Sequence, residues 1–252
     1  MADQVVRLEI TGNIATVTLG SQANRNALSR QLLAEMHAAI EQATHDDGVR
    51  AVVLTHAGPT FCAGADLKER AAGQVPTGPA TMVGVFRQLM HAPQPTIAVV
   101  RGSVRAGGIG LMAACDLVVV ASDVTFAFTE VRLGVAPALI SVPILQRCPW
   151  SKLAAPFLTG EVFDAAAARE MGLVTHVSGD VTATVDTLTR GILTGGPIAV
   201  AATKSLLRSD SAAERAAFVE MDKLSASLFD SPEGAEGMRS FAEHRPPNWV
   251  SR

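Results

Sequence analysis

The sequence predicts a mixed α/β fold, in which a core of about 150 residues is followed by a helical tail. Two strand-like apolar runs, at 51–56 and 96–100, each lead through a glycine-containing turn into a helical segment. Beyond Ser151 helical patterns dominate, and no low-complexity linker separates them from the core. The chain has 252 residues, 48% of them hydrophobic, which is enough for one large core. We therefore predict a single domain over residues 1–252.

The N-terminal part alternates between strand and helix patterns. Residues 5–10 and 14–19 alternate apolar and polar side chains around Gly12-Asn13, which predicts a hairpin. A helix is predicted to follow Ser29, a candidate N-cap. The remaining elements are expected in the order strand 51–56, Gly/Pro-rich loop 71–80, helix 81–92, strand 95–102, a glycine turn opening a helix at 103–116, and strand 116–122.

The C-terminal part is predicted to be almost entirely helical. Apolar residues recur at helical spacing in six segments, and glycine or proline separates most of them. The predicted helices are 151–160, 164–172, 181–193, 197–209, 212–229 and 232–244.

Composition argues against several classes of partner. The net charge is −3, tyrosine is absent and aromatic residues make up 4%, so we expect no nucleic-acid binding. The six histidines form no paired zinc motif, and we expect no metal. The N-terminus has no apolar h-region and no run has the length of a membrane span, so no membrane association is expected. Cys62, Cys115 and Cys148 have no metal-like spacing and indicate reduced thiols in a cytoplasmic protein.

The two glycine turns are candidates for a binding site made of backbone groups. The N–H groups of Ala65 and Gly107 could converge on one ligand oxygen, and small neighbours such as Gly64 would allow a ligand to approach. The alternative is that these glycines only permit tight packing of a helix against a strand, which is the commoner reason for such turns.

Glu130 is the carboxylate best placed for acid–base chemistry. It lies in an apolar stretch, 126–135, and a carboxyl group held there would have a raised pKa. The alternative is a surface residue or a partner of Arg132. Asp66 begins a predicted helix and is explained by capping, and Asp116 begins a strand and could pair with an arginine.

Five stretches, in this order, resemble the enoyl-CoA hydratase/isomerase (crotonase) superfamily over nearly the whole chain. They are RNALS at 25–29, FCAGADLKE at 61–69, VRAGGIGLMAACDLVVVAS at 104–122, FAFTEVRLGVAPALIS at 126–141 and EGAEGMRSFAEHRPPNW at 233–249. The resemblance implies a crotonase-like α/β fold: a spiral of ββα turns in about residues 1–195 and a C-terminal helical trimerisation region in about 196–252.

The resemblance also implies a ligand and a site. The substrate would be an acyl-CoA thioester, with no separate cofactor because coenzyme A is part of the substrate. Ala65 and Gly107 would form an oxyanion hole for the thioester oxygen, and Glu130 would be the catalytic acid–base. The residues implied in substrate and CoA binding are Arg25, Ala27, Ala63, Ala65, Asp66, Leu67, Lys68, Gly107 and Gly108.

One departure from the family pattern leaves the reaction open. Typical hydratases of the family that this chain resembles carry two glutamates. One corresponds to Glu130, and the other stands at the position that Gly110 occupies here. The stretches around both positions nevertheless look like a bacterial subgroup assigned as hydratases, which favours 2-enoyl-CoA hydration. A Δ3,Δ2-enoyl-CoA isomerase with one glutamate and a weakly active acyl-CoA-binding scaffold are the alternatives. Restoring the acid with Gly110→Glu is expected to raise hydratase activity if the pocket admits the side chain.

Further residues are candidates for the acyl pocket and for assembly. Arg105, Gly110 and Leu133 could line the pocket, and Arg105 could bind a second substrate carboxylate, or else an ion-pair partner on a neighbouring subunit or only solvent. The tail could build a homotrimer or hexamer or simply cover its own core. The apolar tail residues in question are Phe218, Met221, Leu224, Leu228, Phe229, Met238 and Phe241.

Overall fold

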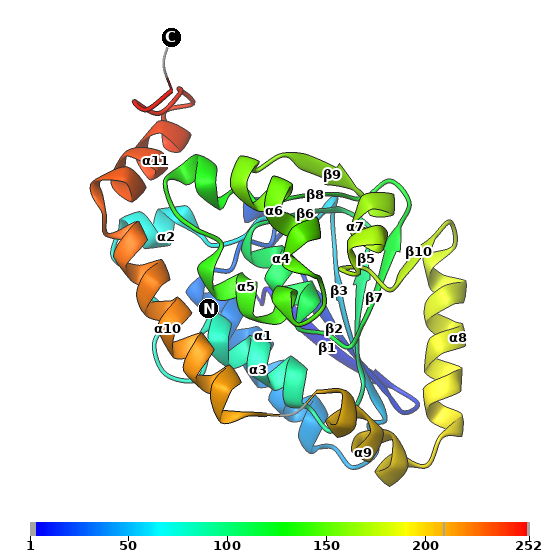
Figure 1. Ribbon diagram of the computed structural model, residues 1–252. Helices are drawn as coiled ribbons and strands as arrows, with labels where there is room; N and C mark the ends of the chain where they lie inside the picture. The colour runs from blue at the N-terminus through cyan, green and yellow to red at the C-terminus, as the bar shows by residue number, and fades with distance from the viewer. Residues whose placement is uncertain (1–3, 209, 251–252) are drawn as a thin grey trace.

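The larger of two sheets has six strands (Figure 1). The computed structural model describes residues 4–208 and 210–250. β1 (Val6–Thr11) pairs antiparallel with β2 (Ile14–Leu19), which confirms the hairpin around Gly12. Parallel pairs continue from β2 through β3 (Ala51–His56), β5 (Thr96–Val100), β7 (Leu117–Ala121) and β10 (His176–Ser178).

The second sheet consists of four strands of three residues each, which the sequence patterns did not reveal. Parallel neighbours β4 (Thr60–Cys62), β6 (Ser103–Arg105) and β8 (Thr125–Ala127) are joined by β9 (Val162–Asp164), antiparallel to β8. Three residues are too few for a periodicity to be recognised.

The chain visits the two sheets alternately. β3 is followed by β4, β5 by β6 and β7 by β8, so that each pass adds one strand to each sheet. The helices α2 (Leu67–Ala71) and α3 (Met82–His91) follow β4, and α4 (Gly107–Ala113) follows β6. This arrangement is the expected spiral of ββα turns, and the predicted crotonase-like α/β fold is confirmed.

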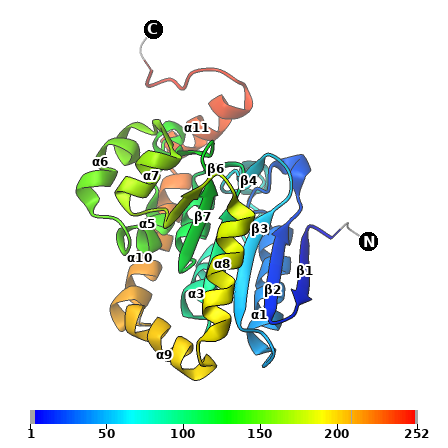
Figure 2. The same ribbon diagram turned by 90° about the vertical axis from the view of Figure 1, so that its right-hand side faces the viewer.

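Both faces of the larger sheet are covered by helices. Alternate residues of β3, β5 and β7 point to opposite sides, because side chains alternate along a strand. One set, with Leu54 and Val100, packs in the main core with α1 (Arg30–His45), α3 and α4. The other set, with Val53 and Val99, packs against α8 (Val181–Thr194), which Figure 2 shows across that face. Burial on both faces explains the nearly continuous apolar runs of these strands.

The other helices complete the molecule. The predicted cap Ser29 is confirmed, since its hydroxyl accepts a hydrogen bond from the N–H of Leu32 at the start of α1. No helix in the described ranges has the length and apolar character that crossing a membrane requires. The remaining elements are η1 (Gln22–Asn24), η2 (Glu130–Leu133), α5 (Ala138–Leu145), α6 (Trp150–Thr159), α7 (Ala165–Met171), α9 (Pro197–Leu207), α10 (Ala212–Phe229) and α11 (Pro232–Ala242).

A buried ion pair fastens the helical tail to the spiral. Lys204 of α9 lies 2.8 Å from Asp116 through its Nζ, and it also donates to the carbonyl oxygens of Leu89 and Gln94. The expectation that Asp116 pairs with an arginine is therefore wrong. A lysine on a distant helix reaches the start of β7 instead, and the sequence pattern gave no sign of that contact. From there α10 and α11 run along one side of the molecule, drawn orange to red in Figure 1.

Candidate active site

Two backbone segments meet at the ends of neighbouring strands. Gly64 and Ala65 follow β4, while Ala106 and Gly107 follow β6, its parallel partner. Gly64 has a φ of +93°, and a Cβ placed on it would lie 2.8 Å from the Cβ of Ala106. Only glycine fits there without displacing its neighbour. The missing side chain is thus what allows the two segments to lie against each other.

The peptide between Ala106 and Gly107 has an unusual orientation. Ala106 has φ +47° and ψ −122°, a conformation that costs a non-glycine residue about 1–3 kcal/mol. The N–H of Ala106 donates to the carbonyl oxygen of Ala127 in β8, at 3.0 Å, which helps to hold the turn. On the other segment, Leu28 donates to the carbonyl oxygen of Gly64 at 2.8 Å.

The N–H groups of Ala65 and Gly107 have no hydrogen-bond acceptor among the described residues, and both residues line one cavity. Paired, unused backbone donors beside a cavity are the arrangement that stabilises an oxyanion. The geometry is consistent with the predicted role of Ala65 and Gly107.

The cavity has a volume of about 470 Å³. A second cavity of about 430 Å³ adjoins it, and both are bordered by Ala65, Met82, Leu139, Ser225 and Phe229. A ligand whose oxygen is bound at Ala65 therefore has space on two sides.

Glu130 is the one acidic side chain among the described residues that line the first cavity. It begins η2, is 9% exposed, and its Oε2 atom is buried without a hydrogen-bond partner. Burial raises the pKa of Glu130 to about 7. Arg132 is not its partner, since the Arg132 Nε donates to the carbonyl oxygen of Thr159 at 3.3 Å. A carboxyl group in this state can both take up and release a proton near neutral pH.

Several other predicted site residues are in the same place. Arg25, Ala63, Leu67, Arg105 and Leu133 line the first cavity.

The remaining predicted binding residues, Ala27, Asp66, Lys68 and Gly108, do not line the first cavity. Asp66 lines the second cavity and its carboxylate caps α2, accepting from the N–H groups of Lys68 and Glu69. Neither cavity is lined by Ala27, Lys68 or Gly108. Gly108 is a close packing point, because a Cβ there would lie 2.7 Å from the Cβ of Cys62.

The guanidinium of Arg105 is engaged within the protein. It donates to the carbonyl oxygens of Val104 at 2.8 Å and Thr125 at 2.7 Å, and to the Thr125 hydroxyl at 3.1 Å. Burial lowers its pKa. These bonds join the side chain of β6 to β8, which accounts for a charged residue at this position without a substrate carboxylate.

Gly110 lies in a filled space. A Cβ on Gly110 would lie 2.5 Å from the Cγ2 of Ile140 and 3.0 Å from the Cζ of Phe86. Gly110 does not line the cavity, whereas Ile140 does. The condition for the expected gain from Gly110→Glu, a pocket that admits the side chain, is therefore not met.

The tail supplies cavity walls that local sequence patterns did not indicate. Ser225 and Phe229 of α10, Ser240 and Phe241 of α11, and Arg245 beyond it all line the first cavity. Most of these residues are about a hundred positions or more from Glu130 in sequence. The resemblance of 233–249 to the family was the one available signal that this segment matters.

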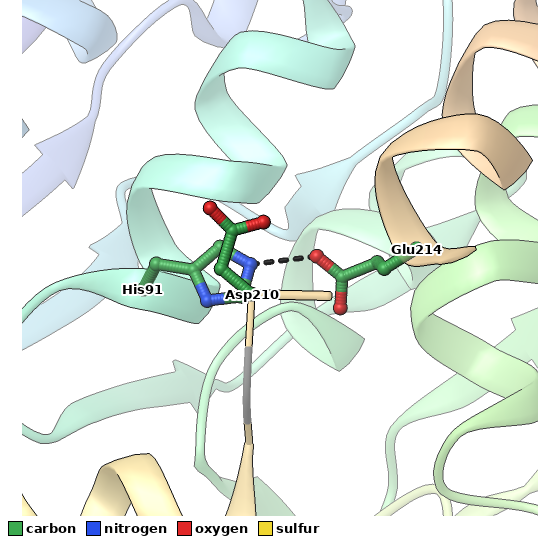
Figure 3. A group of neighbouring side chains, drawn as sticks. All are labelled: His91, Asp210 and Glu214. Atoms are coloured by element: carbon green, nitrogen blue, oxygen red, sulfur yellow. Dashed lines mark hydrogen bonds and ion pairs between the residues drawn. The ribbon is translucent and has the colours of Figure 1, made fainter. Parts of the chain in front are cut away.

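A group of His91, Asp210 and Glu214 lies outside the two cavities and has the donor types of a metal site (Figure 3). Its oxygens already have partners. The His91 Nε2 lies 2.6 Å from Glu214 Oε1, and Gln146 donates to Glu214 Oε2. Two guanidinium groups pair with Asp210, those of Arg87 and Arg215, and they would repel a metal cation. We interpret the group as a connection between α3 and the start of α10.

Comparisons with known proteins agree with this geometry. A family model described as enoyl-CoA hydratase/isomerase matches residues 9–252. An enoyl-CoA hydratase of Mycobacterium tuberculosis is 32% identical, over 97% of this chain and 96% of the relative. A crystal structure of an enoyl-CoA hydratase from Mycobacterium avium is 40% identical with a TM-score of 0.87, over 98% of this chain and all of that one. A carnitinyl-CoA hydratase structure from the same organism is 31% identical, with a TM-score of 0.89 over the full length of both chains.

Gly110→Ala should lower the free energy of unfolding by about 1–3 kcal/mol, because the added methyl group overpacks the space held by Ile140. Urea denaturation measures the loss. In an Ile140→Ala background the cost should be smaller by about 0.5 kcal/mol or more, since the two sites are in contact. Equal costs in both backgrounds would show that the two side chains do not compete for space.

The stability of Glu130→Gln relative to the original protein should depend on pH. Between the ordinary carboxyl pKa and the raised value near 7, the unfolded state binds fewer protons than the folded state. The stability conferred by the protonated group is therefore lost as pH rises through this window. As the pH rises from about 4 to about 8, the free energy of unfolding of the variant should increase by on the order of 3 kcal/mol relative to that of the original protein. Urea denaturation at several pH values checks this, with exposed Glu220→Gln as control, and a pH-independent difference would contradict it.

Proposed function

Because this chain belongs to the enoyl-CoA hydratase/isomerase family, we propose that it is an enoyl-CoA hydratase, adding water to a 2-enoyl-CoA thioester. One observation carries the proposal: the buried Glu130 carboxyl group shares a cavity with the unused N–H groups of Ala65 and Gly107. The names of several relatives, including a methylglutaconyl-CoA hydratase of mouse that is 29% identical over 94% of this chain and 79% of the relative, favour hydration within the family.

One carboxyl group can perform both proton transfers of hydration. Glu130, ionised, takes a proton from water while the hydroxyl oxygen bonds to Cβ and the Cα=Cβ bond breaks. The electron pair moves onto the thioester oxygen, where the N–H groups of Ala65 and Gly107 stabilise the enolate. Protonated Glu130 then delivers the same proton to Cα, and the enolate returns to a thioester. A pKa of about 7 makes both forms of the group accessible.

Charge suggests how the substrate would be oriented. The first cavity is lined by four arginines, Arg25, Arg105, Arg132 and Arg245. Arg105 and Arg132 use their side chains in hydrogen bonds and Arg245 in ion pairs, whereas Arg25 has neither among the described residues and is therefore available to the phosphates of coenzyme A. The second cavity has more acidic than basic lining residues and mostly apolar walls, which suits an uncharged acyl chain. We propose no cofactor besides the coenzyme A of the substrate.

A Δ3,Δ2-enoyl-CoA isomerase is the second candidate. It is favoured by the single carboxylate of the first cavity and by the filled space at Gly110, where a second one would otherwise extend. In that reaction Glu130 would remove a proton from Cα and return it to Cγ, again through an enolate on the same two donors. A weakly active scaffold is less well supported, because a buried, unbonded carboxylate costs stability and needs a function.

Glu130→Gln should lower kcat by about 10⁴-fold, the top of the range for a general acid–base group, and leave the Kd of an acyl-CoA ligand nearly unchanged. Loss of conjugated-thioester absorbance with crotonyl-CoA measures hydration, and its appearance with a 3-enoyl-CoA measures isomerisation. Calorimetric titration measures affinity. More than about a tenth of the original kcat in the variant would remove Glu130 from the mechanism, and no turnover of either substrate by the original protein would favour the scaffold.

The location is proposed to be cytoplasmic. Cys62, Cys115 and Cys148 are all free and buried. Burial raises the pKa of Cys62 and Cys115 to about 12, so these thiols are unreactive packing residues. A chain with three reduced cysteines suits a reducing compartment.

Assembly into trimers or hexamers is proposed from the apolar surface of the tail. Phe218 is buried in the core of its own chain, so this residue covers its own core rather than an interface. Leu224 and Phe241, by contrast, are exposed. The most exposed apolar side chains of the tail lie on α9: Ile198, Leu206 and Leu207. Large apolar side chains exposed together in this way are typical of a subunit interface.

The double variant Leu206→Glu/Leu207→Glu should dissociate the assembly, because it places two charges in the proposed interface. Light scattering after size-exclusion chromatography gives the mass, and Thr187→Glu on the exposed side of α8 is the control. An original protein that is already monomeric, or a double variant with unchanged mass, would contradict the proposed interface.

A further inference from the structure

The catalytic turn η2 is in direct backbone contact with the last helix. Two glycines make this contact possible, one on each side. A Cβ on Gly237 of α11 would lie 2.0 Å from the carbonyl oxygen of Leu133, and a Cβ on Gly134 would lie 2.7 Å from the carbonyl oxygen of Glu233. Both are backbone atoms, which cannot rotate away as a side chain can. The two segments therefore touch at a distance that only glycine allows.

The turn η2 is short and begins without a side-chain cap. It is a single 3₁₀ turn. Besides the bonds internal to the turn, the N–H of Arg132 donates to Thr129 at 3.1 Å, that of Val135 to Glu130 at 3.2 Å, and that of Gly134 to Val131 at 3.3 Å and to Glu130. Short 3₁₀ turns of this kind have poor hydrogen-bond geometry. The position of Glu130, at the first residue of the turn, thus depends on what packs against η2.

Helix α11 is itself firmly held. Glu236, next to Gly237, is 5% exposed and accepts hydrogen bonds from Arg239, from Arg245 and from the N–H of Asn248. The side-chain hydrogen bond from Arg245 lowers the pKa of Glu236 to about 2. At the other end, Gly234 packs against the backbone of Leu228, which fixes the angle between α10 and α11. The helix is thus fixed to the end of α10 and to the segment that follows it.

We propose that Gly237 is a positioning residue for the reaction: by letting α11 lie directly on the backbone of η2, it holds the Glu130 carboxyl group buried in the cavity that Ala65 and Gly107 also line. This role rests on the proposed function of Glu130. Gly237 lines neither cavity and would act through Leu133, whose backbone it lies against. Residues 233–237 of α11, with the sequence EGAEG, then determine how closely this helix approaches η2.

Gly237→Ala should displace η2 from α11 and move Glu130. A displacement of this size lowers kcat by about 10- to 100-fold while KM changes by no more than about threefold, since binding groups elsewhere are intact. The acid limb of the pH–rate profile should move to lower pH, as Glu130 becomes more exposed to water. A purely structural glycine would affect stability and leave the pH profile where it was.

The control is Gly191→Ala on α8, also a helical glycine but with no atom within 4 Å of the added Cβ, and it should retain activity. If Gly237→Ala does not fold, Glu236→Gln loosens the same helix without a clash and should show the same two changes to a smaller degree. A folded Gly237→Ala with original kcat and pH profile would overturn the proposal, as would an unchanged Glu236→Gln. Inactivity of the original protein would instead refute the proposed function.

A measurement that needs no enzymatic turnover can test the role of Gly237 independently of the proposed function. The pH-dependent stability difference between the original protein and its Glu130→Gln variant reports how strongly Glu130 is buried. In the Gly237→Ala background this difference should shrink, because the displaced carboxyl group is better hydrated. An unchanged difference would show that α11 does not keep Glu130 buried, whatever reaction the protein catalyses.

Discussion

The close approach of Gly64 to Ala106 is the contact on which the rest of the site depends. It places the ends of β4 and β6 side by side, so that the N–H groups of Ala65 and Gly107 border the same cavity. A methyl group at Gly64 would clash with the Cβ of Ala106 and push the two segments apart. On the other segment, Ala106 has a strained positive φ. This strain accompanies the orientation of the peptide that carries the Gly107 N–H group.

Around these donors the protein places an uncompensated carboxyl group. Glu130 is buried without a partner for one of its oxygens, in a part of the molecule where the other charged side chains are paired or exposed to water. Burying such a group lowers the free energy of unfolding. Contacts from the surrounding structure must therefore hold it in place. Helix α11 packs on η2 from the far end of the chain, so in the proposed arrangement the position of Glu130 depends on segments about a hundred residues apart.

Much of the fold could be predicted from the sequence, because long amphipathic segments and the hairpin at Gly12 carry strong periodic signals. The second sheet could not, because strands such as β4 have three residues and are specified by their neighbours rather than by their own pattern. At the site, the proposed roles of Ala65, Gly107 and Glu130 come from the motifs and from the chemistry of these groups. The filled space at Gly110, and the wall formed by Phe229, depend on distant side chains that only the folded chain brings together.

The two cavities share a boundary between the spiral and the tail, and this has a consequence for how the protein can diversify. The donors and Glu130 belong to the spiral, whereas Ser225 and Phe229, which border both cavities, belong to α10. Substitutions at these two positions would therefore reshape both cavities at once, including the one that Glu130 lines. Descendants of one ancestral gene would then explore new substrates through α10 only where turnover tolerates the same change. Selection would then act on the spiral and the tail together rather than on each separately.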